Sequence, residues 1–298
     1  MIEGAGKIPR GRFILHMLRA SVGRTRRATR EHVYKQLGPE DLAVTFVGHA
    51  TFLLQWKGIN VLTDPNFVRR VLVPKRLVEP GIQIRELPSI DVILISHAHF
   101  DHLVKPSLRK LPKDTPVIVP TGLADLITPL GFRHVHELNW WEAHKADGWQ
   151  VTHVPSKHWG RRTPRDRERG YGGFVIEREG HHAYFAGDTA YFGGFAEIGR
   201  AFPIDVALLP IGGYRPPSFR RVHCNPEDAL QALDDMQARY MVPMHWGTFR
   251  LSYEPIEEPV AWLQRLTNGN GFADRVKILR HGQTFVVPER ISGPHPSH

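Results

Sequence analysis

The stretch Asp91-Val92-Ile93-Leu94-Ile95-Ser96-His97-Ala98-His99-Phe100-Asp101-His102 decides both the fold and the chemistry of this chain. Residues 92–95 form an apolar run typical of a strand that is buried on both faces of a sheet. Side chains able to bind a metal therefore stand at the end of a buried strand. In extended backbone His97 and His99 point to the same side, so both imidazoles can meet one ion. Asp101 and His102 follow after a bend and can meet a second ion.

Short strands separated by turn residues surround this stretch, beginning at about residue 41. The clearest helix has Asn225 as its N-cap, Pro226 in its first turn and an apolar stripe that ends at Tyr240. Strands mixed with helices, without a linker or repeat, predict one α/β domain with a two-sheet core covered by helices. We expect strands at residues 42–47, 51–55, 59–63, 91–95, 117–119, 150–154, 172–176, 182–186, 206–209, 240–243 and 276–279, and further helices at 106–110, 123–128, 194–200 and 259–266.

Length and composition place the chain among ordinary globular proteins. It has 298 residues, of which 41% are apolar and 23% are charged, so disordered, collagen-like and coiled-coil classes are excluded. No run approaches the roughly 18 apolar residues of a membrane-spanning helix. The single cysteine, Cys224, rules out an intrachain disulfide framework and fits a reducing compartment, so we expect a cytoplasmic protein.

The net charge of +9 is concentrated in a basic arm at the N-terminus. Residues 1–35 hold nine Lys/Arg against Glu3 and Glu31, and apolar residues at 13–18 interrupt them. We interpret residues 1–40 as an extension of a domain that spans 41–298. A solvated basic face is the favoured interpretation of the arm; the alternative is peripheral contact with an anionic inner-membrane surface. A secretory signal is not expected, because the short apolar run ends at Arg19.

Three later residues complete an ordered set with the first stretch. His158 stands in Pro155-Ser156-Lys157-His158-Trp159, Asp188 in Phe185-Ala186-Gly187-Asp188-Thr189, and His245 in His245-Trp246-Gly247-Thr248-Phe249. This order resembles the metallo-β-lactamase superfamily, which implies an αββα four-layer sandwich of two mixed sheets flanked by helices. The resemblance implies that His97, His99 and His158 bind a first metal, that Asp101, His102 and His245 bind a second, and that Asp188 bridges both.

Further motifs narrow the resemblance to phospholipases D that hydrolyse N-acylphosphatidylethanolamine. They are Gly48-His49-Ala50-Thr51, Leu62-Thr63-Asp64-Pro65 and Asn139-Trp140-Trp141-Glu142, together with the segments that hold His158 and His245. The match spans roughly residues 41–285. It implies hydrolysis of N-acylphosphatidylethanolamine-like glycerophospholipids to phosphatidate and N-acylethanolamine. The first 40 residues lack a recognisable counterpart of the apolar-rich N-terminal region of the animal enzyme.

Catalytic roles follow from the same resemblance. Mixed imidazole and carboxylate ligation suits zinc, so two zinc ions are expected, with iron or manganese left open. One zinc lowers the pKa of its water to about 7 and so provides a nucleophile near neutral pH. Asp101 is expected to orient this nucleophile and Asp188 to hold both ions. His223, in a segment like the branch's active-site histidine loop, is expected near the scissile group, where it positions or protonates the leaving group.

The sequence gives less reason to assign the following residues to the site. We interpret His153 as a hydrogen-bonded strand residue and the Cys224 thiol as no nucleophile, because a metal site supplies its own. His49 and Asp64 are turn residues by pattern, although Asp64 at a strand end could orient a ligand histidine. Residues 157–169 carry six basic against two acidic residues, and Arg215, Arg220 and Arg221 precede His223. These cations either rim a pocket for a phosphodiester or face water.

Two alternatives to a phospholipase stay open from the sequence. One is another hydrolase on the same scaffold, such as a lactonase or a soluble phosphodiesterase. The other is a nuclease in which the basic arm binds nucleic acid; it is disfavoured because the interleaved aromatic residues of a single-strand platform are sparse. The sequence also leaves a homodimer open.

Overall fold

The first sheet is built around the buried strand that the sequence singles out. In the computed structural model, which describes residues 11, 15, 24–29, 31, 37, 41–56 and 58–290, that strand is β4 (Val92–Leu94). It lies between β3 (Ile59–Thr63) and β5 (Val117–Pro120) and runs parallel to both. The sheet order is β13-β1-β2-β3-β4-β5-β6, the other strands being Leu42–Gly48 (β1), Thr51–Trp56 (β2), Val135–Leu138 (β6) and Thr284–Val287 (β13).

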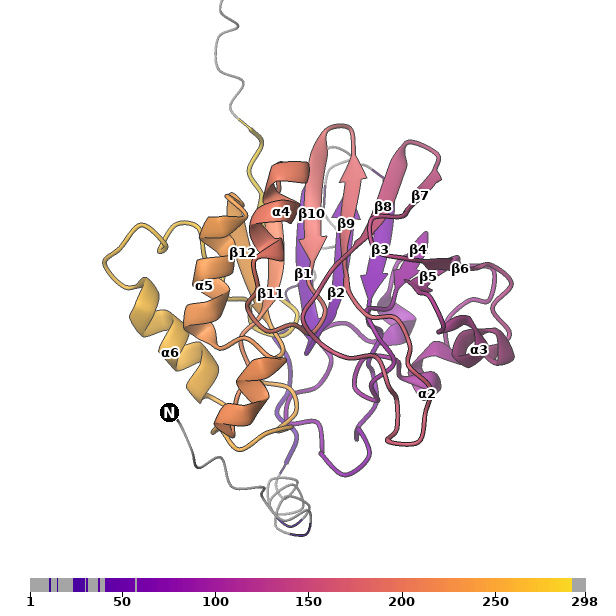
Figure 1. The fold of residues 1–298 in the computed structure, drawn as a ribbon, viewed down its shortest axis with the longest axis horizontal. Helices are drawn as coiled ribbons and strands as arrows, with labels where there is room; N and C mark the ends of the chain where they lie inside the picture. Colours follow the sequence, from indigo (N-terminus) through magenta and orange to yellow (C-terminus); the bar gives the residue numbers. More distant parts are fainter. Residues whose placement is uncertain are drawn as a thin grey trace, which may run out of the picture.

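The second sheet faces the first (Figure 1). Its order is β12-β11-β10-β9-β8-β7, in which β10, β11 and β12 are parallel and the remaining neighbours are antiparallel. Both sheets are therefore mixed. The bounds are Ala143–Ala146 (β7), Trp149–Val154 (β8), Gly173–Arg178 (β9), His181–Phe185 (β10), Val206–Pro210 (β11) and Tyr240–Met244 (β12).

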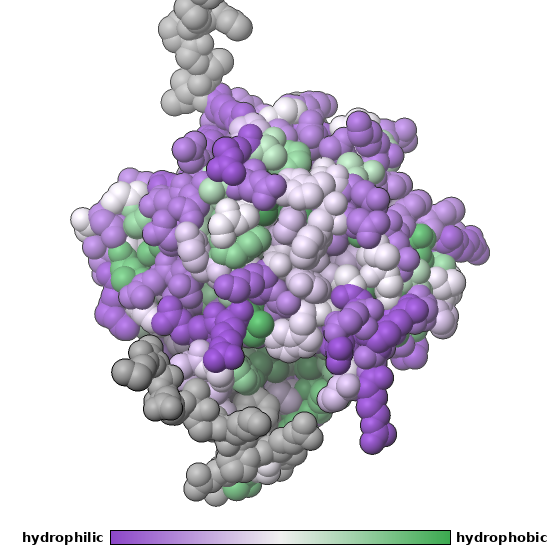
Figure 2. All heavy atoms as spheres, in the orientation of Figure 1, coloured by the Kyte–Doolittle hydropathy of each residue, from purple (hydrophilic) through white to green (hydrophobic). Residues whose placement is uncertain are grey.

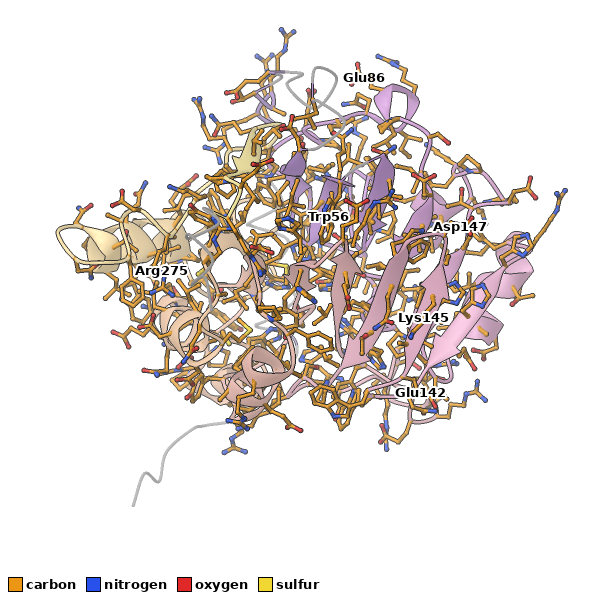
Figure 3. The ribbon with its side chains drawn as sticks, turned by 90° about the horizontal axis from the view of Figure 1, so that it is seen from above. Trp56, Glu86, Glu142, Lys145, Asp147 and Arg275 are labelled. Carbon is orange, nitrogen blue, oxygen red and sulfur yellow. The ribbon has the colours of Figure 1, made fainter. Side chains whose placement is uncertain are left out.

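Alternation along the strands divides the core into two parts. Val92 and Leu94 belong to the cluster between the sheets, whereas Ile93 belongs to a second cluster on the other face of the first sheet. Trp56 is buried in the first cluster, with its ring 6.4 Å from that of His181 in the opposite sheet. Figure 3 shows the molecule from above the view of Figure 1, with Trp56 labelled.

Helices cover the outer faces of both sheets (Figure 1). Leu108 and Ile127, from α2 and α3, bury their side chains in the cluster on the outer face of the first sheet. Ile198 of α4 and Leu233 of α5 pack into the cluster that includes the second sheet, and α6 packs on α5. The αββα sandwich expected from the sequence is confirmed. The helices are Lys105–Leu108 (α2), Ala124–Ile127 (α3), Gly194–Ala201 (α4), Pro226–Asp235 (α5) and Glu258–Thr267 (α6), with 3₁₀ turns at Ile84–Glu86 (η2), Thr128–Leu130 (η3) and Pro217–Arg221 (η4).

Local signals explain the α5 boundary that the sequence predicts. The Asn225 side chain accepts a hydrogen bond from the Asp228 backbone N–H, and the Asp228 carboxylate accepts one from the Asn225 N–H. This reciprocal capping box satisfies two backbone donors that a helix start leaves unpaired. The helix ends at Asp235, one turn earlier than the apolar stripe suggests, and Gln237 adopts a φ of 53°.

One predicted strand is wrong and three strands are missed. Residues 276–279 make only an isolated bridge, from Val276 to Met241, and then enter the turn before His281. The missed strands are β6, β7 and β13. Their sequences are short and partly polar, and much of their surface is exposed, so period-2 alternation is weak there.

The interpretation of the basic arm falls mostly on residues outside the described part of the chain. None of the described helices has the length and apolar character needed to cross a bilayer.

The buried carboxylate of Asp205 fastens the end of the described chain to the second sheet. It accepts hydrogen bonds from Arg239, from Arg290 and from the backbone N–H of His182. Burial opposes the charged form, but the two guanidinium groups outweigh it and hold the pKa of Asp205 below its ordinary value. A lowered pKa in the folded state stabilises the protein above the unfolded-state pKa of about 4, and this contribution is lost as the pH falls through the folded-state value.

We predict that Asp205→Asn lowers the free energy of unfolding at neutral pH by about 3 kcal/mol, because it leaves two arginines without their shared carboxylate. The variant should also lose less stability than the parent protein on acidification. Denaturant titrations at neutral and acid pH measure both effects. Asp274→Asn, at an exposed carboxylate, is the control; equal losses in the two variants would contradict the assignment.

Candidate metal centre

Polar side chains gather at one edge of the sandwich, where strands of both sheets end. In the first sheet β1, β3 and β4 run in the same direction, and in the second sheet β8, β10 and β12 do so. We call this edge the site edge and residues 97–102, which follow β4, the metal loop. Candidate ligands come from the metal loop and from the loops after β8, β10 and β12; they are His97, His99, Asp101, His102, His158, Asp188 and His245.

A first group of candidate ligands consists of His97, His99, His158 and Asp188. Their nearest ligand atoms all lie within 4.8 Å of one another. The Nδ1 atom of His99 is 2.9 Å from Nε2 of His97 and 3.2 Å from Nε2 of His158. Three ring nitrogens therefore converge on one point, which is the arrangement that a bound cation requires.

A second group consists of Asp101, His102 and His245, and it also includes His49. The Oδ2 atom of Asp101 is 3.4 Å from Nε2 of His102 and 3.6 Å from Nε2 of His245. The Nε2 atom of His49 lies 3.0 Å from the same oxygen. The structure thus brings together all seven residues that the sequence assigns as ligands and adds His49 beside them.

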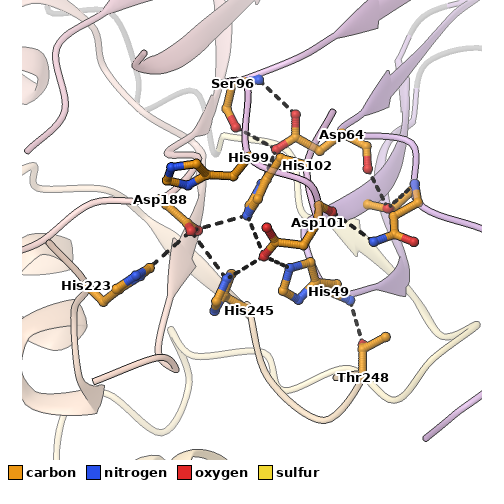
Figure 4. Close-up of polar contacts among 12 residues, drawn as sticks. His49, Asp64, Ser96, His99, Asp101, His102, Asp188, His223, His245 and Thr248 are labelled. Atoms are coloured by element: carbon orange, nitrogen blue, oxygen red, sulfur yellow. Dashed lines mark hydrogen bonds and ion pairs between the residues drawn. The ribbon is translucent and has the colours of Figure 1, made fainter. Parts of the chain in front are cut away.

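Asp188 lies close to ligand atoms of both groups, and Figure 4 shows its contacts with His102, His245 and His223. Its Oδ2 atom is 3.2 Å from Nε2 of His102 and 3.3 Å from Nε2 of His245. The same oxygen is 4.0 Å from Nε2 of His97 and 3.9 Å from Nε2 of His158. This central position is the one that a bridging carboxylate occupies.

Asp64 orients His102 from behind. Its side chain is fully buried, and it accepts hydrogen bonds from the backbone and hydroxyl of Ser96. The Nδ1 atom of His102 lies 2.6 Å from Oδ2 of Asp64, which leaves Nε2 directed toward Asp101 and Asp188 (Figure 4). A carboxylate that takes the second ring N–H of a ligand histidine fixes its tautomer and orientation. Asp64 is placed to do this for His102.

The remaining sequence candidates lie at different distances from the centre. His223 is partly buried beside it, with Nδ1 3.7 Å from Oδ2 of Asp188. His153 is buried against Phe174, and it is in none of the ligand groups. Burial raises the pKa of the Cys224 thiol well above its ordinary value, so this group is a poor thiolate nucleophile.

Burial and neighbouring carboxylates set the charge of the imidazoles. Burial lowers the pKa of His97 and His158 well below 6.5. It also opposes protonation of His102 and His245, but there the nearby carboxylates outweigh it, Asp188 foremost. The pKa of His245 is raised to about 9, and that of His102 is raised well above 6.5. An ion that binds the second group must therefore displace protons from its histidines.

Several buried polar atoms in the centre have no hydrogen-bond partner. They include Nε2 of His102, Nε2 of His245 and Oδ1 of Asp188. Orphaned polar atoms are rare in folded proteins because each one costs free energy. Imidazole nitrogens and carboxylate oxygens are also the donors that zinc and related ions accept. The residues present therefore fit a metal centre.

A cavity of about 710 Å³ opens beside His99 and Asp101. Besides these two residues it is lined by residues 71–74, Phe100, Trp159, residues 161–164 and Leu251. Most of these side chains are apolar. The sequence interpretation overlooked the wall at 71–74, although its signal was present: the stretch Arg69-Arg70-Val71-Leu72-Val73-Pro74-Lys75-Arg76 places four apolar residues between pairs of cations.

Arg162 is the cation of this cavity that reaches the metal loop. Its Nη1 donates hydrogen bonds to the carbonyl oxygens of Ala98 and Leu103, at 2.5 and 3.0 Å. Its guanidinium group also lies 4.1 Å from the centre of the Phe100 ring. The side chain therefore binds the backbone within the metal loop and directly after it, while it lines the cavity.

The expected rim of cations is only partly present. Arg161 and Arg162 line the cavity, but Arg169 is buried and bonded to Asp125 and Asp166. Arg215 pairs with Glu258, and Arg220 pairs with Asp228. Most of the positive charge near His158 and His223 in the sequence is thus used in ion pairs within the fold.

Residues 59–246 match the family model described as Beta-lactamase superfamily domain. An uncharacterized protein of Mycobacterium tuberculosis is 37% identical over 232 residues, covering 74% of this chain and 62% of that protein. A mitochondrial N-acyl-phosphatidylethanolamine-hydrolyzing phospholipase D of Saccharomyces cerevisiae is 35% identical over 256 residues. The match covers 80% of this chain and 55% of that protein. A UPF0173 metal-dependent hydrolase of Rubrobacter xylanophilus is 33% identical over 212 residues, covering 69% and 82%.

The first two relatives are longer proteins, and the chain spans less than two thirds of their length. Among solved structures, isothiocyanate hydrolase from Delia radicum gut bacteria has a TM-score of 0.70 at 21% identity, covering 83% of this chain and all of that one. The diiron β-hydroxylase CmlA from Streptomyces venezuelae has a TM-score of 0.62 at 19% identity, covering 84% and 55%. At these identities the likeness concerns the fold alone.

The chain belongs to the β-lactamase superfamily. A relative in this superfamily is named a metal-dependent hydrolase, and the described His and Asp groups of this chain could hold a metal ion. The superfamily assignment made from the ordered motifs is therefore confirmed.

We predict that Asp64→Asn weakens metal binding by about 10- to 100-fold, because His102 loses the carboxylate that orients it. Titration of the metal-free protein with zinc, followed by a competing chromophoric chelator, measures the affinity. Asp114→Asn, at an exposed carboxylate on the surface, serves as the control. Unchanged affinity in the Asp64 variant would show that His102 does not need this partner.

Proposed function

We propose that this chain is a zinc-dependent phosphodiesterase of phospholipase D type, which hydrolyses N-acylphosphatidylethanolamine-like glycerophospholipids to phosphatidate and N-acylethanolamine. The observation that carries the proposal is the apolar cavity that opens directly beside His99 and Asp101. Buried acyl chains require apolar walls, whereas a small water-soluble diester does not. The names of the yeast relative and of a Caenorhabditis elegans relative, 33% identical over 229 residues, support the same substrate class.

Two zinc ions are the proposed cofactors. The first would be held by His97, His99 and His158 and the second by Asp101, His102 and His245, with Asp188 between them. Imidazole and carboxylate donors suit zinc, while iron and manganese accept the same donors. The fold does not select among these metals, since CmlA is described as a diiron enzyme.

Each nearby side chain has a distinct task in the proposed reaction. Bound zinc would supply an ionised water near neutral pH and a Lewis acid for the phosphate. Asp101, held by His49 through its Oδ2, would orient the attacking water. His223, 3.7 Å from Asp188, would position or protonate the departing alkoxide.

Arg162 would bind the anionic phosphate. Its described hydrogen bonds use Nη1, and the side chain lines the cavity next to His99 and Asp101. A guanidinium group in this position can donate a charge-assisted hydrogen bond to a non-bridging phosphate oxygen. The acyl chains would then extend between Trp159 and residues 71–74.

The reaction is tested with three substrates on metal-loaded protein: detergent-dispersed N-acylphosphatidylethanolamine, a nucleotide diester and an acyl lactone. We expect the phospholipid to have the highest kcat/KM and to yield phosphatidate, identified by mass spectrometry. Preference for the lactone or the nucleotide diester would replace the proposal with one of those activities.

We predict that Asp188→Asn abolishes phospholipid turnover and lowers the zinc content per chain. An amide oxygen lacks the negative charge that two cations share in a bridging carboxylate. Elemental analysis and product formation are the two measurements, again with Asp114→Asn as the control. Full hydrolysis at full zinc content would refute the bridging role.

We predict that Arg162→Lys lowers kcat/KM about tenfold and that Arg162→Gln lowers it about 100-fold. Lysine keeps a charge but loses the planar fork, and glutamine loses both. Arg165→Gln is the matched control, since Arg165 is exposed in the same loop and does not line the cavity. Equal activity of the lysine and glutamine variants would contradict a role for the charge.

A further inference from the structure

Leu72 combines two features that a soluble protein normally avoids. It is the most exposed large apolar residue of the described chain, at 69% of its surface. Its φ of 52° also places it in the left-handed region, which Gly or Asn adopts at lower cost than leucine. Neither feature helps the fold, and an unfavourable backbone geometry at an exposed apolar residue is a reason to look for a binding role.

The turn that carries Leu72 is held firmly in place. We call residues 69–76 the tip loop. The backbone N–H of Val71 donates to the carbonyl of Pro74 at 3.0 Å, and that of Arg76 donates to the carbonyl of Arg69 at 2.9 Å. The buried guanidinium of Arg76 then donates to the carbonyl oxygens of residues 66 and 68. Leu72 is thus presented on a fixed scaffold.

A second exposed apolar side chain lines the same cavity as the tip loop. Trp159 is 41% exposed, and both it and Leu72 line the cavity. In Figure 2 apolar side chains gather along the lower part of the molecule, where the site edge lies in Figure 1. The cavity is therefore lined by two large apolar side chains that are also exposed at the surface.

Cations surround these apolar residues. The tip loop contains Arg69, Arg70, Lys75 and Arg76 and no acidic residue, and the first two are exposed. In the loop after β8, Arg165 is exposed close to Trp159 in the sequence, and the exposed Arg161 is paired with Glu168. An apolar tip with a collar of cations matches a surface whose outer layer is anionic and whose interior is hydrocarbon.

We infer that the tip loop and Trp159 dock the site edge on an anionic phospholipid bilayer, with Leu72 entering the acyl-chain region. This inference deepens the proposed phospholipase function and rests on it for its purpose: docking would place the cavity mouth against the lipid surface from which a substrate's acyl chains could enter. The proposed contact through the tip loop and Trp159 is distinct from the membrane contact considered for the basic arm at residues 1–35.

Vesicle binding of the full-length, metal-loaded chain tests the inference. Co-sedimentation is measured with vesicles of phosphatidylcholine alone and of phosphatidylcholine mixed with phosphatidylserine. We expect binding to the anionic vesicles that weakens with salt, and about tenfold weaker binding for Leu72→Asn. The same variant should be at least as stable as the parent in thermal unfolding, because asparagine tolerates the left-handed backbone.

The matched control is Val286→Asn. Val286 is 38% exposed and pairs with Ala43 near the start of β1, at the end of the sheet opposite to the site edge. Its vesicle binding should equal that of the parent. Leu72→Gly provides a second variant if the asparagine protein is unstable, with the same expected loss.

Four outcomes would overturn docking: no binding by the parent, equal binding to neutral vesicles, equal binding by both Leu72 variants, or self-association that the Leu72 variants abolish. The last would assign the tip loop to a second copy of the chain. Because binding is measured apart from turnover, the two proposals fail separately. Leu72-dependent vesicle binding without phospholipid hydrolysis rejects the proposed reaction only, and hydrolysis of dispersed substrate without such binding rejects docking only.

Discussion

A single carboxylate oxygen, Oδ2 of Asp188, lies within 4.0 Å of ring nitrogens from five histidines: His97, His102, His158, His223 and His245. A buried negative charge is costly unless positive charge or strong donors surround it. Burial opposes the charged form, yet His102 and His245 hold the pKa of Asp188 well below its usual range. The rest of the centre is arranged about this oxygen, and the loops after six strands supply the groups that surround it or hold its neighbours.

The supporting contacts explain why the centre keeps its geometry. Asp64 links the loop after β3 to Ser96 and His102, and Asn66 donates to the backbone carbonyl of Asp101. Arg162, from the loop after β8, donates hydrogen bonds to the carbonyl oxygen of Ala98 in the metal loop and to that of Leu103 directly after it. The metal loop is thus fixed by charged or polar partners from both sheets. Because the ligands are already held in place, metal binding does not have to meet the free-energy cost of ordering them.

Local sequence signals predict part of this architecture and no more. The apolar run at β4 followed by four ligand-type residues predicts a strand and a metal turn from short-range physics alone. His158, Asp188 and His245 are up to 148 positions from His97, and only the resemblance of ordered motifs connects them. The sequence did not assign His49 to the site, because its contact with Asp101 depends on β1 and β4 ending at the same edge of the sheet. The short exposed strands β6, β7 and β13 escaped because tertiary pairing, not propensity, defines them.

The division of the ligands between the two sheets has a consequence for assembly. The first sheet contributes the metal loop, while His158, Asp188 and His245 belong to the second, so neither half of the sandwich can form the centre by itself. High-affinity metal capture must therefore come late in folding, after the halves have joined. An ion bound there would link the two sheets. Its release would weaken the contact between the sheets rather than the structure of either sheet.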